Sequence, residues 1–94
     1  MNPADLSVVN ARVRTVAERI QPLLEPHPGL AQRNAHAHAW LGLKVTFGDE
    51  WRVRTAPESV HAFLDWMEAN PNSDYGDYPG PRRELSAEAR GELF

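Results

Sequence analysis

Apolar residues recur at intervals of three and four along the first part of the chain. They are Leu6, Val9, Val13, Val16, Ile20 and Leu23. This spacing places them on one face of an amphipathic helix. Asn2 and Pro3 suit its cap and first turn, and Pro22 should end it near Ile20. Because the stripe also fits a short coiled-coil seam, a homodimer through this helix is an alternative to packing within the chain.

Residues 35–47 have a pattern that fits both a strand and a helix. Every odd-numbered position from Ala35 to Phe47 is apolar, which is the alternation of a half-buried strand. The same region is rich in alanine and contains Gly42, where a helix could end. Its candidate partner strand, WRVRT, has only five residues. We therefore expect a second helix over about residues 30–41, followed by a short strand.

The run LKVTFGDEWRVRT predicts a β-hairpin of residues 43–47 and 51–55. In this register Phe47 would face Trp51 and Val45 would face Val53 on the buried side, because a one-residue slip would mix apolar and charged groups. The alternative is that residues 40–47 continue the helix, which would make the fold all-α.

The motif TAPE at residues 55–58 has the pattern of a capping box and predicts a third helix over residues 56–69. Residues 70–84 are rich in proline, glycine, aspartate and tyrosine, which is typical of a loop. A short terminal helix is expected over residues 85–94. The pattern as a whole predicts one small α+β domain over residues 1–94.

The composition of the chain excludes some kinds of site and bears on its cellular location. The chain has 94 residues, which is the size of one domain, and no cysteine, so disulfides and zinc–thiolate sites are excluded. The N-terminal MNPADLSVVN does not have the pattern of a secretory signal, and no apolar run approaches the ~18 residues of a membrane helix. A cytoplasmic location is expected.

The net charge of −3 is unevenly distributed along the chain. Residues 1–56 carry seven basic and five acidic side chains, whereas residues 57–94 carry three and eight. The overall acidity argues against a broad nucleic-acid-coating surface, which needs an extended positive footprint.

The acidic second part contains the main candidate for partner binding. Tyrosine is favoured at interfaces because it offers a large area and a polar tip. The predicted surface joins the acidic-aromatic loop to the preceding helix: Asp74, Tyr75, Asp77 and Tyr78, with Asp65, Trp66 and Glu68.

Nucleic-acid binding through a basic face of the hairpin is the alternative function. On the outer face Lys44 would lie across from Arg54 and Thr46 across from Arg52, and like charges directly opposite each other can serve an anionic partner. Arg12 and Arg14 could extend this surface.

His36 and His38 are the weak candidates for a metal site, with His61 as a third ligand. On a strand both imidazoles would share one face, roughly 7 Å apart. On a helix, residues two apart diverge, so the predicted helix over 30–41 counts against a metal. We therefore expect no metal and no other cofactor.

Enzyme motifs are absent: the sequence has no phosphate-binding glycine loop, nucleophile elbow or paired-carboxylate signature. The run AWLGLKVTFGDEWR and the later FLDWME, within residues 39–68, resemble the helical tails of some phage regulatory proteins through their W..LK..FG spacing. This likeness carries no site residue over. The expected function is a small non-enzymatic protein-binding module, an inhibitor or regulator of a larger machine of the phage or mobile-element type.

Overall fold

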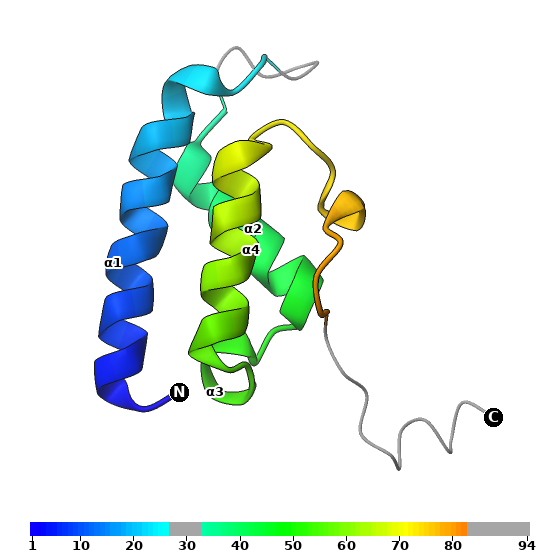
Figure 1. The fold of residues 1–94 in the computed structure, drawn as a ribbon. Coiled ribbons are helices and arrows are strands. Elements are labelled where there is room, and N and C mark those ends of the chain that lie inside the picture. The colour runs from blue at the N-terminus through cyan, green and yellow to red at the C-terminus, as the bar shows by residue number, and fades with distance from the viewer. Residues whose placement is uncertain (27–32, 83–94) are drawn as a thin grey trace, which may run out of the picture.

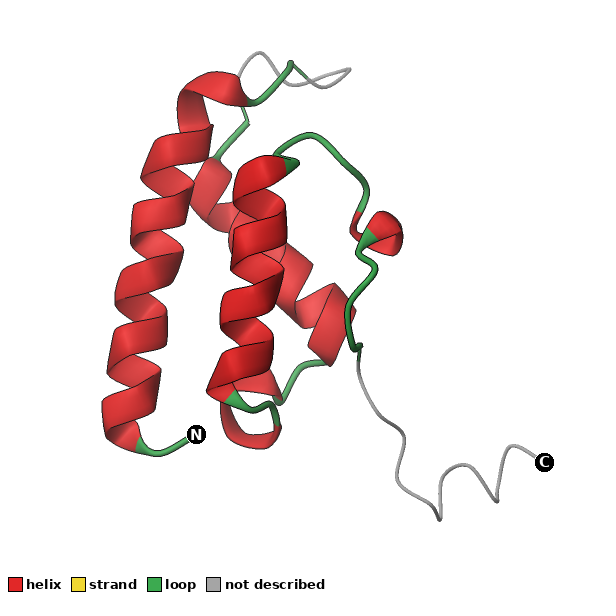
Figure 2. Cartoon of the chain, viewed as in Figure 1, coloured by secondary structure: helices red, strands yellow, loops and turns green. Residues whose placement is uncertain are grey.

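The computed structural model describes residues 1–26 and 33–82, and all regular structure within them is helical (Figures 1 and 2). The elements are α1 (Pro3–Ile20), η1 (Gln21–Leu23), α2 (Ala35–Phe47), α3 (Trp51–Arg54), α4 (Pro57–Ala69) and η2 (Tyr75–Asp77). The predicted terminal helix over residues 85–94 lies outside the described residues, as does the predicted start of the second helix. No helix in the described ranges has both the length and the apolar character needed to cross a membrane.

Three helices form the body of the molecule. In Figure 1, α1 and α4 lie side by side and run in the same direction, and α2 crosses behind them in the opposite sense. The short α3 joins α2 to α4, and the chain beyond α4 returns along α2 through η2. The core lies between the facing sides of α1, α2 and α4.

Helix α1 follows the sequence pattern closely. The side-chain oxygen of Asn2 accepts a hydrogen bond from the backbone N–H of Asp5 at 2.8 Å, so the predicted cap is formed. The helix ends at Ile20, two residues before Pro22, as predicted. Four members of the predicted apolar stripe, Val9, Val13, Val16 and Ile20, pack in the core of the chain together with Ala17, whereas Leu23 is exposed.

The predicted hairpin over residues 43–47 and 51–55 is not formed, so the α+β prediction is wrong and the all-α alternative is correct for the described residues. Residues 43–47 continue α2, and residues 51–54 form α3. Thr46, expected on the solvent-facing side of a strand, is buried.

The physical reason is that two rows of one helix can imitate the alternation of a strand. The row at 35, 39, 43 and 47 is spaced by four and is buried. The row at 37, 41 and 45 has the same spacing and is exposed. Offset by two residues, the two helical rows make every odd position apolar, although only one row faces the core.

Glycines act at two places in α2. Gly42 does not end the helix: it is buried, and a Cβ added there would lie 2.9 Å from the nearest side-chain atoms of Met67, Phe63 and Tyr75. The absence of a side chain therefore lets α4 and η2 pack closely against α2. The helix ends at Phe47, and the following Gly48 caps it: its φ of 94° suits glycine, and its N–H donates to the carbonyl of Lys44 at 2.8 Å.

Helix α4 matches the predicted range to within one residue, but its start differs. Ala56 is the N-cap residue and makes no side-chain capping bond, so the predicted capping box is not formed. Pro57 occupies the first turn, where its missing N–H costs nothing. The buried residues of α4 are Val60, Phe63, Leu64 and Met67.

Candidate functional site

Tyr78, predicted to anchor a partner, is a core residue. Its side chain is 5% exposed. Its ring centroid lies 5.1 Å from that of Phe63, 5.5 Å from Trp66 and 6.5 Å from Phe47. The tyrosine therefore fixes the segment after α4 to the α2–α4 pair. Trp66 is half-buried beside it.

Tyr75 also turns toward the chain, and it meets His38 of α2. The Nε2 atom of His38 lies 3.0 Å from the carbonyl of Pro71, which can only accept, so Nε2 carries the proton. Nδ1 is then the acceptor, 2.6 Å from the Tyr75 hydroxyl and 3.3 Å from Nη2 of Arg33. The same hydroxyl lies 2.8 Å from the His38 carbonyl. This network holds residues 71–75 against α2.

The environment of His38 disfavours its charged form. Burial lowers its pKa below the usual value, the nearby Arg33 guanidinium lowers it further, and the bond to Pro71 opposes both effects. Burial also raises the pKa of Tyr75. His38 is therefore a neutral structural link near pH 7.

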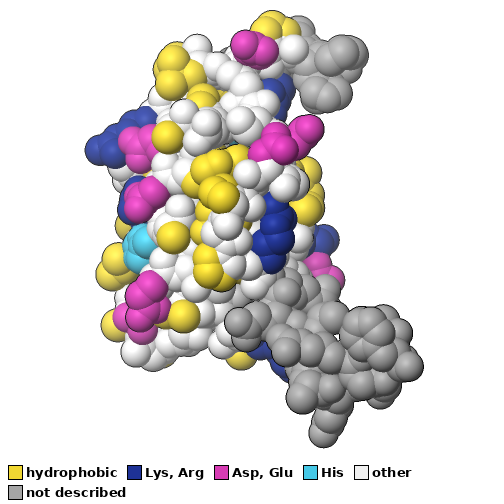
Figure 3. All heavy atoms as spheres, turned by 45° about the vertical axis from the view of Figure 1, so that its right-hand side comes forward, with side chains coloured by type: hydrophobic (Ala, Val, Ile, Leu, Met, Phe, Trp, Pro, Cys, Tyr) yellow, Lys and Arg dark blue, Asp and Glu magenta, His cyan; other side chains and the backbone are white. Residues whose placement is uncertain are grey.

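Two acidic residues of α4, Asp65 and Glu68, are paired with arginines of α1. Arg12 bonds to Asp65 and lies 3.6 Å from Glu68, and Arg19 bonds to Glu68 at 2.9 Å. Arg12, a candidate for nucleic-acid binding, thus forms ion pairs with Asp65 and Glu68, two candidates for partner binding. Figure 3 shows described side chains of both charges interspersed with hydrophobic ones over the face in view, with no broad area of a single sign.

The acidic loop still contributes two exposed carboxylates. Asp74 directly precedes η2 and Asp77 is its last residue, and both remain open to solvent. The predicted acidic-aromatic surface therefore keeps its charges at η2, while its tyrosine rings face inward.

The predicted basic face depended on the hairpin and is absent with it. Lys44 on α2 lies 3.6 Å from Asp49, and Arg54 on α3 is paired with Glu50. Arg14 lies apart from these residues, exposed on α1. The basic candidates are distributed over α1, α2 and α3, although Lys44 and Arg52 line the same space between α2 and α3.

The three histidines predicted as candidates for a metal site do not lie together. His36 stacks on Trp40, with ring centroids 5.7 Å apart, whereas His38 faces Tyr75. His61 belongs to α4. Within residues 1–26 and 33–82, no group of three or more metal-ligating side chains is placed to hold an ion.

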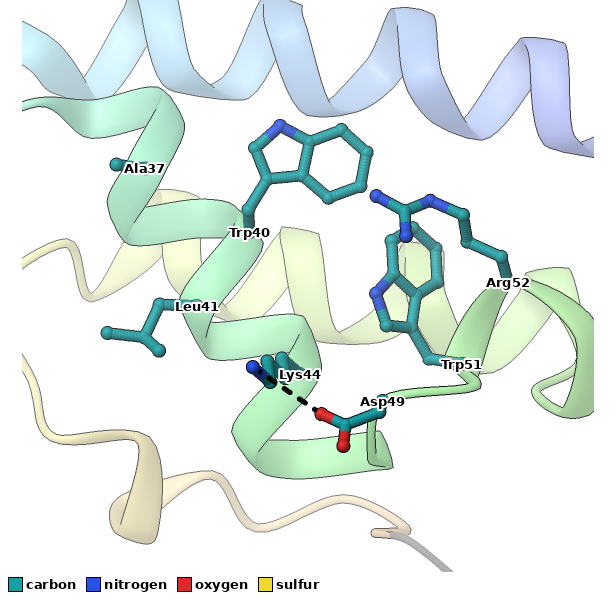
Figure 4. A pocket seen from close by; sticks show the side chains of 7 residues that line it. All are labelled: Ala37, Trp40, Leu41, Lys44, Asp49, Trp51 and Arg52. Atoms are coloured by element: carbon teal, nitrogen blue, oxygen red, sulfur yellow. Dashed lines mark ion pairs between the residues drawn. The ribbon is translucent and has the colours of Figure 1, made fainter.

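A groove between α2 and the start of α3 is a feature that the sequence prediction missed. Its volume is about 510 Å³, and it is lined by Ala37, Trp40, Leu41, Lys44, Asp49, Trp51 and Arg52 (Figure 4). The ring centroids of Trp40 and Trp51 are 5.3 Å apart. The Arg52 guanidinium lies 4.5 Å from the first ring and 4.8 Å from the second.

An exposed apolar row borders this groove. Leu41 is 52% exposed and Val45 is 56% exposed, one turn apart on α2, and Ala37 precedes them by another turn. We call this row, together with the groove, the α2 outer face. The apolar residues at odd positions were the signal in the sequence, but only the helical geometry separates the exposed row from the buried one.

Comparisons with protein-family models, curated protein sequences and solved structures returned no match for this chain.

Proposed function

We propose that the chain is a small non-enzymatic protein-binding module whose contact surface is the α2 outer face. The observation that carries this proposal is that α2 is apolar on two opposite sides. One side, with Ala39 and Leu43, is buried, whereas the other, with Leu41 and Val45, is open. The apolar side of a helix is normally turned away from water, so a partner surface over the open side would complete the burial of the apolar residues of α2.

The side chains of the groove support the same proposal. Tryptophan and arginine are enriched among the residues that dominate binding energy at interfaces. Here the half-buried Trp40 and the exposed Arg52 lie beside the open apolar row. The groove could receive side chains of a partner that covers Leu41.

The acidic loop lies beside the same helix. Tyr75 contacts His38 of α2, which brings Asp74 and Asp77 to that side of the molecule. We propose that these carboxylates form part of the rim, where charge influences association rate and partner choice more than affinity. Inhibition or regulation of a larger assembly is the role that we propose for such a module.

Affinity capture from the native host tests this function. The double variant Leu41→Glu, Val45→Glu should lose the captured partner, because two carboxylates on the apolar row would have to be buried in the complex. The matched control is Val8→Glu, Leu23→Glu, since these residues are 60% and 56% exposed and lie on α1 and η1. Circular dichroism should show that both variants are folded.

Equal recovery of the partner by the two double variants would contradict the proposed surface. Asp74→Asn, Asp77→Asn is the third arm of the experiment. It should slow association at low salt and have little effect at high salt, where exposed charges are screened.

A further inference from the structure

We infer that the partner of the α2 outer face is an amphipathic helix that carries carboxylates, and that Arg52 recognises its charge. The inference rests on the proposed function and specifies the chemistry of its partner. It follows from the state of Arg52, the charge around the groove and the spacing of the exposed row.

Arg52 is held in position by aromatic rings and has no acidic partner in the described chain. Its guanidinium lies over both Trp40 and Trp51 (Figure 4), and such cation–π contacts restrict its orientation. None of the ion pairs found among residues 1–26 and 33–82 includes it. A planar guanidinium presents paired N–H donors that match the two oxygens of a carboxylate.

The charge lining the groove also favours an acidic ligand. Lys44 and Arg52 contribute two positive charges against the single carboxylate of Asp49. The Lys44–Asp49 pair spans 3.6 Å between side chains that are 63% and 78% exposed, so solvent weakens it. A carboxylate from a partner could therefore engage Lys44 as well as Arg52.

The apolar part of the face fits a helix. Ala37, Leu41 and Val45 follow one another at intervals of four along α2, next to the groove that contains Trp40. Helices that dock on such surfaces present apolar residues at matching intervals of three and four. The expected partner segment therefore has an apolar stripe over Leu41 and an acidic flank toward Arg52.

Two synthetic peptides test the inference on the full chain. Both are blocked amphipathic helices with the same leucine stripe; one has glutamate and the other lysine along the flanks. Binding is measured by backbone amide NMR shifts and tryptophan fluorescence at two salt concentrations. The leucine–glutamate peptide should bind at least about tenfold more tightly at low salt, and this preference should shrink as salt screens the charges. The shifts should centre on Leu41 and Arg52.

Variants of Arg52 separate its charge from its geometry. Arg52→Gln should reduce the affinity for the leucine–glutamate peptide about tenfold, and it should not reduce that for the lysine peptide, because it removes a charge that repels lysine. Arg52→Lys should fall between, because it keeps the charge and loses the planar fork. Arg14→Gln is the matched control, since Arg14 is exposed on α1 and also forms none of the ion pairs in the described chain.

Equal binding of the two peptides, or an Arg52→Gln variant that binds like the native chain, would overturn the inference. A concentration-dependent dimer that Leu41→Glu dissociates would also overturn it, because the face would then bind a second copy. If Leu41→Glu, Val45→Glu still loses the captured partner in these cases, the proposed function stands. Capture that is insensitive to this double variant would instead reject the proposed function itself.

Discussion

Gly42 lies inside α2, where any side chain would meet three neighbours. A Cβ there would be 2.9 Å from atoms of Phe63, Met67 and Tyr75. Alanine normally favours a helix over glycine by about 1 kcal/mol, but overpacking should outweigh this gain. We expect Gly42→Ala to lower the free energy of unfolding by about 1–3 kcal/mol, measured by urea denaturation. The control is Gly76→Ala, where a Cβ meets nothing within 4 Å. A Gly42→Ala variant as stable as the native chain would show that α2 and α4 do not cross this closely.

His38 should make stability depend on pH. Its pKa in the folded chain is lowered, chiefly by burial and then by Arg33, from the usual value of 6.5. Well above pH 6.5 the imidazole is neutral in both the folded and the unfolded chain, and its contribution to stability is complete. As pH falls from 6.5 toward the lower folded pKa, the unfolded chain binds the proton more readily, and stability is lost.

Urea denaturation of the native chain and of His38→Gln measures this effect. Glutamine cannot titrate, and its amide can still donate to the Pro71 carbonyl. Between pH 7.5 and 5 the native chain should therefore lose more stability than the variant. Parallel pH profiles would mean that His38 titrates as it does in an unfolded chain.

At the scale of elements, the helices with one apolar face were predicted well from the sequence, and the helix with two apolar faces was not. Helices α1 and α4 each have one buried stripe, and the sequence predicted their ends to within about one residue because a single stripe has an unambiguous period. Helix α2 has two apolar rows, and together they produce the alternation of apolar residues that is typical of a strand. The five residues of WRVRT reinforced that error, although α3 buries only Trp51.

The described part of the segment after α4, residues 70–82, contains no regular structure other than η2, but its packing was not predictable from composition. Tyr78 belongs to the core, so Tyr78→Ala should cost about 3 kcal/mol of stability, as truncation of a buried aromatic does. Tyr78→Phe keeps the ring and should stay within about 1 kcal/mol of the native chain. Thermal denaturation compares the two. A Tyr78→Ala variant of native stability would place the ring at the surface, as the sequence had suggested.

At the scale of the molecule, the candidate site depended on contacts that sequence order does not reveal. Arg12 and Asp65 are far apart in the chain but form an ion pair across α1 and α4. Tyr75 and His38, which belonged to two separate hypotheses, contact each other. Residue types alone locate the exposed carboxylates Asp74 and Asp77 near η2, whereas the groove between α2 and α3 depends on the course of the helices. The open apolar side of α2, with Leu41 and Val45, is the feature that a partner would cover.

Photo-crosslinking from position 41 tests that claim most directly. A photoreactive amino acid replaces Leu41 in one variant and the exposed Arg14 in the other, and both are irradiated in the native host. The α2 outer face predicts a discrete covalent adduct with one protein from position 41 and none from position 14. No adduct at position 41, or the same adducts from both positions, would contradict the assignment of this face as the binding surface.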